Sequence, residues 1–145
     1  MADLKIVTGA DPAAGAELTA QVVPADVIWV PLAVIVSLVQ GITQTPLPFL
    51  ILDDGTNNLF EGPGSSAAMV ASTTCQFTWA LGLPLTGQVG TGTGVRSTGS
   101  LARLPLKTGF RIRTITNGIG ANSNYGVPRF YVAELTGSDK LTDWL

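Results

Sequence analysis

The chain has 145 residues and a mass of 15.0 kDa, which fits one domain with a buried core. Charged residues make up only 12% of the sequence, about half the roughly 25% usual for soluble domains, so we expect something other than water to cover part of the surface. The sequence has no histidine and one cysteine, which excludes Ser-His-Asp and Cys-His catalysis, an intrachain disulfide and a thiolate metal cage.

The first residues, 1–5, do not show the basic and apolar regions of a secretory signal peptide. The most apolar run, residues 27–39, is shorter than the roughly 20 residues that a membrane-spanning helix needs, and Pro31 interrupts it. We therefore expect neither export by this route nor a membrane span.

Apolar segments separated by prolines predict strands in the first half of the chain. Pro31 would break a long helix, and the β-branched run of residues 34–36 fits a pleated sheet better than a helix. The pattern predicts strands near residues 20–23, 27–40 and 47–53. Residues 53–58, rich in Asp, Asn and Gly, predict a hairpin tip that returns through residues 59–61.

The second half of the chain predicts further strands around a long loop. A strand is expected over residues 68–81, with Cys75 as a small buried hydrophobic residue. Residues 82–100 are mostly Gly, Thr and Ser and predict a long mobile loop, after which order resumes at 101–105. Residues 110–116 alternate with period two, and the last predicted strand spans residues 127–135.

Short strands joined by Gly, Pro and Asn turns predict an all-β fold, an antiparallel β-sandwich or jelly roll with short or no helix. We expect a single sandwich domain over residues 1–137 and a C-terminal tail, residues 138–145, which is the one candidate for a short helical turn. The tail carries Leu141, Trp144 and Leu145, and we expect it to dock on the body or on a neighbouring molecule.

Charge is segregated along the chain. Residues 1–61 hold seven acidic groups and one basic group, whereas residues 62–133 hold six basic groups and no acidic one. Two arrangements follow from this pattern. The halves form two faces of opposite sign that favour contacts with other molecules, or they interleave in the sandwich so that the charges average out.

Motifs that carry chemistry are weak in this sequence. Gly90–Gly94 lacks the context of a phosphate-binding loop, and the Asp and Asn residues of 53–58 lack the spacing of an EF-hand. A loop and a turn are the favoured interpretations. Paired carboxylates for glycoside hydrolysis have no recognisable spacing here. We therefore expect no enzymatic activity, no cofactor and no metal.

The aromatic and basic residues favour a protein partner over nucleic acid. The sequence pI is about 4.8, and the aromatic residues do not interleave with basic ones as stacking platforms do. Arg111 and Arg113, on one face of a strand, are expected to pair with carboxylates within the sandwich or at an interface. The residues expected in the core are Trp29, Phe77, Trp79, Phe110 and Phe130, whereas Tyr125 and Trp144 are expected as interface anchors.

Several local patterns together resemble the small structural proteins of tailed bacteriophage virions. The patterns are residues 6–17, Val23-Pro24-Ala25 with Trp29, residues 52–57, Leu104-Pro105-Leu106, residues 109–116, Asn124-Tyr125, Pro128 and residues 131–135. The chain departs from the family pattern with Asp26 in place of Gly, Ser123 before Asn124, and Ala133 in place of the first Glu of a terminal VEE segment.

The resemblance implies a virion β-sandwich, and with the low charge it favours a capsid decoration (cement) protein. Such a protein would bind the outer surface of the shell as a homo-oligomer, a trimer at local symmetry axes, and bridge copies of the major capsid protein. The alternatives are a tail, neck or head-fibre component that binds host glycans, or a free carbohydrate-binding module. The candidate interface residues are Arg96, Arg103, Arg111, Arg113, Arg129, Tyr125, Leu141, Trp144 and Leu145.

Overall fold

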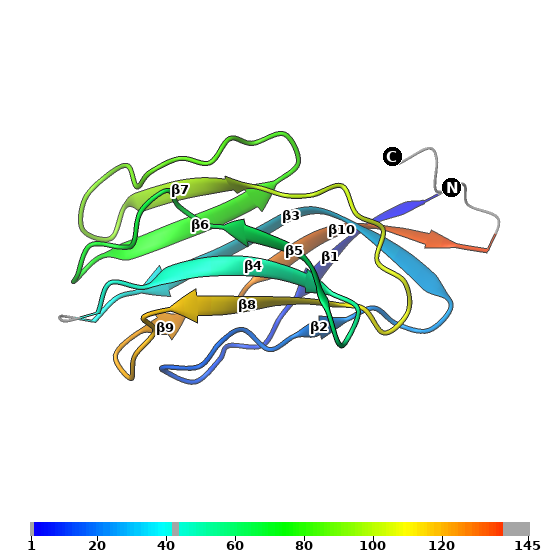
Figure 1. Cartoon of the computed structure of the whole chain (residues 1–145), viewed down its shortest axis with the longest axis horizontal. Coiled ribbons are helices and arrows are strands. Elements are labelled where there is room, and N and C mark those ends of the chain that lie inside the picture. Colours follow the sequence, from blue (N-terminus) through cyan, green and yellow to red (C-terminus); the bar gives the residue numbers. More distant parts are fainter. Residues whose placement is uncertain (1, 42–43, 138–145) are drawn as a thin grey trace.

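The computed structural model describes residues 2–41 and 44–137, and all regular structure in this part of the chain is strand (Figure 1). The strands are β1 (Asp3–Thr8), β2 (Gln21–Val22), β3 (Val27–Val39), β4 (Leu47–Asp53), β5 (Asn58–Pro63), β6 (Thr74–Ala80), β7 (Val95–Ser100), β8 (Arg111–Asn117), β9 (Asn124–Tyr125) and β10 (Arg129–Thr136). The predicted all-β fold class is confirmed. The proposed helical turn in residues 138–145 lies outside the described residues.

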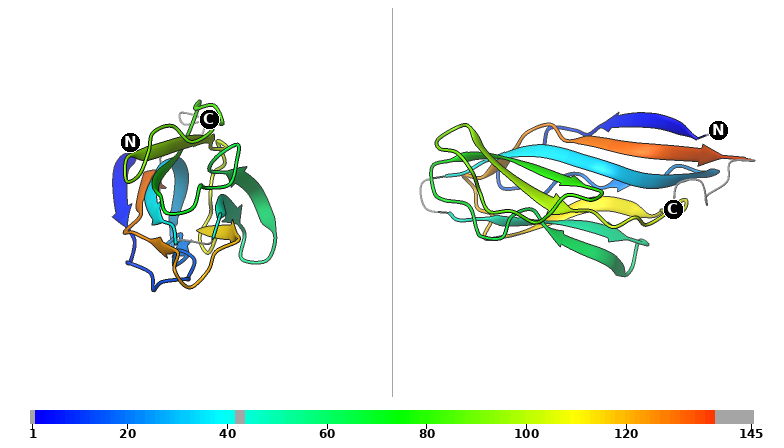
Figure 2. Two further views of the ribbon diagram at one scale, coloured as in Figure 1. Left: turned by 90° about the vertical axis from the view of Figure 1, so that its left-hand side faces the viewer. Right: turned by 90° about the horizontal axis from the view of Figure 1, so that it is seen from above.

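The strands form two sheets that pack face to face (Figure 2). The larger sheet has the order β1-β10-β3-β6-β7, with β9 paired to β3, and the smaller sheet has the order β2-β8-β4-β5. The pair β6–β7 is parallel, and the other strand pairs are antiparallel. This arrangement is the predicted sandwich, with one parallel pair added.

Alternate side chains of both sheets fill the space between them, as expected for a sandwich. Phe77 and Trp79 of β6 are fully buried and stack with their ring centroids 5.9 Å apart. The indole nitrogen of Trp79 donates to the carbonyl oxygen of Gly62 at 2.9 Å, so this buried polar group is satisfied. The predicted core residues Trp29, Phe77, Trp79, Phe130 and Cys75 are buried, and Phe110 packs partly buried against them.

Two strands near the ends of the chain were not predicted from the sequence. β1 pairs with β10, its partner at the opposite end of the chain, and β9 pairs with the last residues of β3. Both depend on distant partners, so their local sequence gives little sign of them. By contrast, β4 spans residues 47–53 as predicted, and β3 spans 27–39.

The predicted loop of residues 82–100 and the predicted strand of 68–81 both need correction. Residues 95–100 form β7, whose backbone pairs with β6, so the loop is shorter than expected. The strand begins only at Thr74, because Ser72 has a φ of 59° and residues 71–72 form a turn. Met69 is nevertheless buried in the core.

Candidate interaction surface

The larger sheet has one face toward the core and one face away from the second sheet. Successive residues of a strand alternate between the two faces, and residues opposite each other on paired strands share a face. One row across the sheet runs through Thr8, Arg129, Ile35, Thr78 and Thr98. We call this side the outer face; its side chains are Leu4, Ile6, Thr8, Ile28, Val30, Leu32, Ala33, Ile35, Ser37, Val39, Thr74, Gln76, Thr78, Ala80, Arg96, Thr98, Ser100, Asn124, Arg129, Tyr131, Ala133 and Leu135.

One end of the outer face exposes large apolar side chains on an edge strand. Leu4 is 65% exposed and Ile6 is 55% exposed, both on β1, which has a neighbour on one side only. The intervening Lys5 points the other way, where its ammonium donates to Glu134 at 3.0 Å and lies 5.9 Å from the ring centre of Trp29. An inward charge of this kind discourages edge-to-edge pairing, but it leaves the apolar face of β1 open.

Glu134 holds this edge of the sheet in place. Its carboxylate accepts from the indole nitrogen of Trp29 at 2.7 Å as well as from Lys5. These two hydrogen bonds, the Trp29 bond first, lower the pKa of Glu134. The carboxylate is therefore ionised near neutral pH and ties β1 to β10 and β3.

The outer face also holds a small apolar cluster that is separate from the main core. Val30, Ala133 and Leu135 form it, and their exposed fractions are 0%, 0% and 3%. Ile28 and Leu32 pack against this cluster from the same face. These side chains are buried although they lie on the side of the sheet that faces away from β4 and β8.

The other end of the outer face is basic. Arg96 on β7 is exposed and donates to Gln76 at 3.1 Å, and Arg129 at the start of β10 is also exposed. Arg129 borders a shallow pocket of about 120 Å³ that Ile35, Ser37 and Gln76 also line. None of the strand residues that form the outer face is acidic, so this surface is positively charged.

Arg111 and Arg113 lie on the other sheet, where Asp53 binds both. The Nε atom of Arg111 donates to Asp53 at 2.7 Å and a terminal nitrogen of the same side chain donates at 3.1 Å; Arg113 also donates to this carboxylate. Asp53 is 1% exposed. Of the two expected alternatives for these arginines, the structure shows pairing with a carboxylate of the same chain, so the guanidinium groups of these two candidate interface residues make an internal contact.

The Asp53 pairing also bears on the segregation of charge along the chain. Burial by itself raises the pKa of Asp53, but the hydrogen bonds from Arg111, Arg113 and the amide of Gly55 outweigh burial and lower the pKa. An acidic residue of the first half thus binds two arginines of the second half and offsets one of their two positive charges. At this position the halves interleave, as the second of the two expected arrangements requires.

Of the remaining candidate interface residues, one is buried, one is exposed and three lie outside the described residues. Tyr125 is fully buried, which corrects its assignment as an interface anchor. Its hydroxyl lies 2.5 Å from the hydroxyl of Thr116, which also donates to Glu17 at 2.9 Å, so the ring is part of an internal polar network. Arg103 is exposed on the segment that leads to Leu106. Leu141, Trp144 and Leu145 lie outside the described residues.

The two sequence motifs with possible ligand chemistry form ordinary turns. Asp54 accepts from the amides of Thr56 at 2.9 Å and Asn57 at 2.7 Å, which is the side-chain turn predicted for residues 53–58. Residues 90–94 form a loop closed by backbone bonds between Val89 and Arg96. Among residues 2–41 and 44–137, no group of three or more Cys, Asp and Glu side chains is placed to hold a metal ion. The same residues contain no helix long and apolar enough to cross a membrane.

No model of a known protein family matches the chain, and no curated protein matches its sequence. Among solved structures, the chain is similar to the structure of the infectious bursal disease virus Gx strain. The TM-score is 0.34 and the sequence identity is 12%, over 99% of this chain and 43% of that one. This chain therefore spans less than half the length of the protein it matches, and the likeness is too loose to carry function.

Proposed function

We propose that the chain is a structural protein of a tailed bacteriophage virion, and that it is a decoration protein on the outer surface of the capsid. In this proposal it binds the shell as an oligomer, a trimer at local symmetry axes, and it bridges copies of the major capsid protein. It has no catalytic role, and its partners are proteins, not nucleic acid or membranes. The resemblance of its turn and strand motifs to virion proteins gives the class, and the surface described above supports the role.

The observation that carries the proposal is the outer face of the larger sheet. This face exposes Leu4 and Ile6 on the edge strand at one end and Arg96 and Arg129 toward the other end, with no acidic strand residue between them, and such a surface is suited to contact with another protein. The apolar side chains supply the area to be buried, and the arginines supply charge that orients the partner. Contacts made only in the assembled shell stabilise that state by mass action.

A glycan-binding role in a tail, neck or head fibre, or as a free carbohydrate-binding module, is less well supported. Such sites present an exposed aromatic ring beside Asn or Asp. Among residues 2–41 and 44–137, no aromatic side chain is exposed: Trp79, Tyr125 and Phe130 are buried and Tyr131 is half-buried. The described surface therefore favours the decoration role.

The first test is the copy number of this protein in purified virions separated into heads and tails. Quantitative mass spectrometry should find it in heads at a near-stoichiometric ratio to the major capsid protein. A few copies per particle, or recovery with tails, would move the assignment to a neck, spike or adhesion component. Absence from virions would overturn the proposal.

The second test locates the contact surface by co-sedimentation of the purified protein with undecorated shells. The double variant Leu4→Ser/Ile6→Ser should lose at least tenfold in affinity, because two exposed apolar side chains leave the interface. The matched control is Val22→Ser/Leu59→Ser, which changes two side chains that are 54% and 45% exposed on edge strands of the smaller sheet. Equal loss in both variants would mean that the outer face is not the contact surface.

A further inference from the structure

β1 has an open edge whose backbone groups have no described partner. It pairs only with β10, and Figure 2 shows it at the outer margin of the larger sheet, with no described segment beyond it. The amide of Gly9 continues the register of β1 and donates to Pro128 at 3.0 Å, so the backbone of Gly9 faces β10. Backbone groups of an antiparallel strand face its two sides in alternation, so the amides and carbonyls of Leu4, Ile6 and Thr8 face the open edge.

Asp3 places a carboxylate on this strand that has no cation of its own. It is exposed and lies directly opposite Glu134 of β10, and like charges in that position repel each other. Lys5 points to the same side as Asp3, but its ammonium donates to Glu134 at 3.0 Å. No described side chain forms a hydrogen bond or ion pair with Asp3. A cation from another molecule would therefore stabilise this part of β1.

We propose that β1 pairs edge to edge with β1 of a second copy of this chain. The two strands run antiparallel around a two-fold axis, with Leu4 opposite Leu4 of the second copy. In this register, Asp3 of each chain lies opposite Lys5 of the other chain, and the larger sheets of the two copies become one continuous sheet. This contact goes beyond the function proposed above and does not rest on it.

Charge and side-chain direction select this register among its neighbours. The outer faces of the two copies lie on the same side only if even-numbered residues pair with even-numbered ones, so the alternatives are shifts by two residues. If Leu4 lay opposite Ile6, Lys5 would lie opposite itself, and the shift in the other direction places Asp3 opposite itself. Both arrangements set like charges against each other. If Ile6 lay opposite itself, Lys5 would face Val7 and no pair of opposite charges would form.

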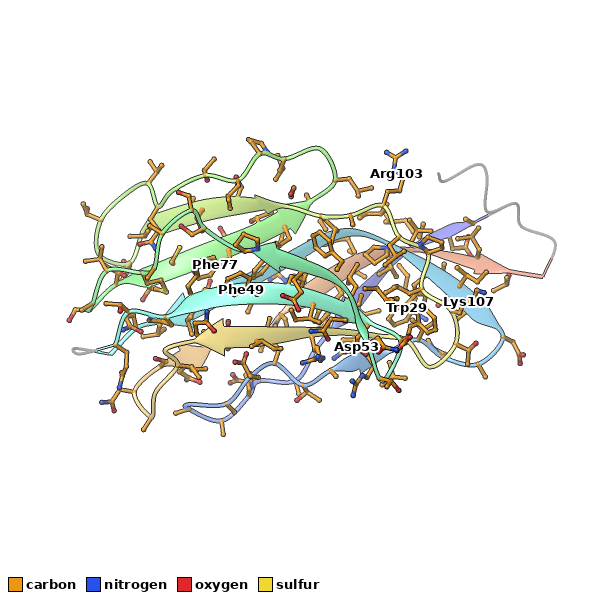
Figure 3. The ribbon with its side chains drawn as sticks, viewed as in Figure 1. Trp29, Phe49, Asp53, Phe77, Arg103 and Lys107 are labelled. Atoms are coloured by element: carbon orange, nitrogen blue, oxygen red, sulfur yellow. The ribbon has the colours of Figure 1, made fainter. Side chains whose placement is uncertain are left out.

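Lys5 makes this edge selective for its own copy. Its ammonium is held on the inner side of the sheet by Glu134 and lies 5.9 Å from the ring centre of Trp29, which Figure 3 shows inside the sandwich. Opposite an apolar or basic residue, this charge discourages pairing. Opposite Asp3 it favours pairing, because an ammonium group has three donors and can bind a second carboxylate. The same charge therefore rejects other strands and accepts β1.

The contact leaves the outer face of the sheet open. The side chains of Leu4 and Ile6 stand perpendicular to the sheet, so pairing through the backbone at the edge does not cover them. The apolar ends of the two outer faces then lie side by side across the axis. A two-fold contact closes on itself and gives a dimer, so it is a different contact from that of the proposed trimer.

Cross-linking through introduced cysteines tests the register. The Cα atoms of the paired Leu4 residues would lie about 5.5 Å apart, which a disulfide can bridge. Leu4→Cys should therefore give a disulfide-linked dimer under mild oxidation. Ile6→Cys should not, because its two Cα atoms would lie about 14 Å apart. The unsubstituted protein, whose Cys75 is buried, is the control. No cross-link through Leu4→Cys, or as much through Ile6→Cys, would overturn the proposal.

Sedimentation equilibrium tests the two charge pairs. The unsubstituted protein should show a monomer–dimer equilibrium, and Asp3→Lys should weaken the dimer at least tenfold because two attractive pairs become repulsive. The matched control Asp11→Lys makes the same charge change at an exposed residue beyond the end of β1 and should leave the dimer unchanged. Absence of a dimer, or an equal effect of the two substitutions, would overturn the proposal. Neither experiment reads shell binding, so their failure would leave the proposed function standing.

Discussion

Asp53 at the end of β4 accepts hydrogen bonds from both Arg111 and Arg113, which sit one strand away on β8 and point to the same side of the smaller sheet. The carboxylate is buried, whereas the two arginine side chains remain 35% and 25% exposed. One carboxylate therefore binds two cations at the base of the 53–58 turn, offsets one of their two positive charges, and joins that turn to the neighbouring strand.

Replacement of Asp53 by Asn should destabilise the protein by about 1.5–3 kcal/mol, the usual range for hydrogen bonds to charged groups, because it removes the carboxylate that both guanidinium groups bind. Urea unfolding at neutral pH measures this loss. The control Asp54→Asn keeps an oxygen acceptor for the amides of Thr56 and Asn57 and should change stability far less. If the two variants were equally stable, the Asp53 pairing would contribute little to the fold.

The same pair predicts a dependence of stability on acid. The pKa of Asp53 is lower in the folded protein than its ordinary value, so its contribution is fully present above the unfolded pKa of roughly 3.9. The contribution is lost as pH falls through the lower folded value. The free energy of unfolding should therefore decline below about pH 4, and Asp53→Asn should reduce this decline. A parallel decline in both proteins would assign the acid sensitivity to other carboxyl groups.

Gly99 of β7 has no room for a side chain. A Cβ atom there would lie 2.3 Å from the carbonyl oxygen of Pro63 and 2.9 Å from Cδ1 of Trp79. Gly99→Ala should cost about 1–3 kcal/mol, as overpacking of a tight core does, and should weaken the parallel pairing of β7 with β6. The control is Gly94→Ala, whose Cβ would meet nothing nearer than 3.7 Å. Chemical denaturation measures the free energy of unfolding of both variants. A Gly99→Ala variant as stable as the unsubstituted protein would contradict the observed packing.

Tyr125 should resist ionisation in the folded protein. Burial raises the pKa of its phenol well above the ordinary value of roughly 10. Because burial keeps this phenol neutral in the folded protein, Tyr125 contributes to stability below about pH 10. This contribution is lost as the pH rises further. In the variant Tyr131→Phe, which leaves Tyr125 as the remaining tyrosine, ultraviolet titration should show tyrosinate only together with unfolding. A reversible titration near pH 10 in the folded state would contradict the burial.

Cys75 should behave as an inert thiol. It is fully buried on β6, and burial raises the pKa of its thiol, so little thiolate is available to react. A coloured thiol reagent should label it only as fast as the protein opens, and the rate should increase with urea. Rapid labelling of the native protein at pH 8 would show that β6 and β7 separate easily.

The fold was predictable from the sequence where strands carry their own signal. β4 combines apolar residues with a terminal Asp-Asp-Gly turn, and the predicted bounds, residues 47–53, agree with the structure. β7 has no such signal. Its inward residues are Val95, Ser97 and Gly99, because Trp79 and Phe77 fill the space beside them, and small polar residues in sequence look like a loop. The strand exists because β6 lies next to it.

The candidate surface was predictable only in part for a similar reason. Sequence reasoning selected the arginines as contact residues, and the structure places Arg96 and Arg129 on one face but binds Arg111 and Arg113 to Asp53. Leu4 and Ile6 were not selected, although the alternation of residues 3–8 is visible in the sequence. What the sequence could not show is the neighbour: β10, at the other end of the chain, is the strand beside which Leu4 and Ile6 lie exposed.

The place of β10 in the larger sheet also constrains how the protein can be made. β10 lies between β1 and β3, so the first strand of the chain has no partner until residues 129–136 have been synthesised. During translation, β1 and one edge of β3 lack the strand that pairs with them in the folded protein. The sheet is complete only when β10 pairs with both. Such non-local pairing makes folding slow and leaves the apolar strands open to association in the meantime. The step that completes the sheet therefore comes only after residues 129–136 have been made.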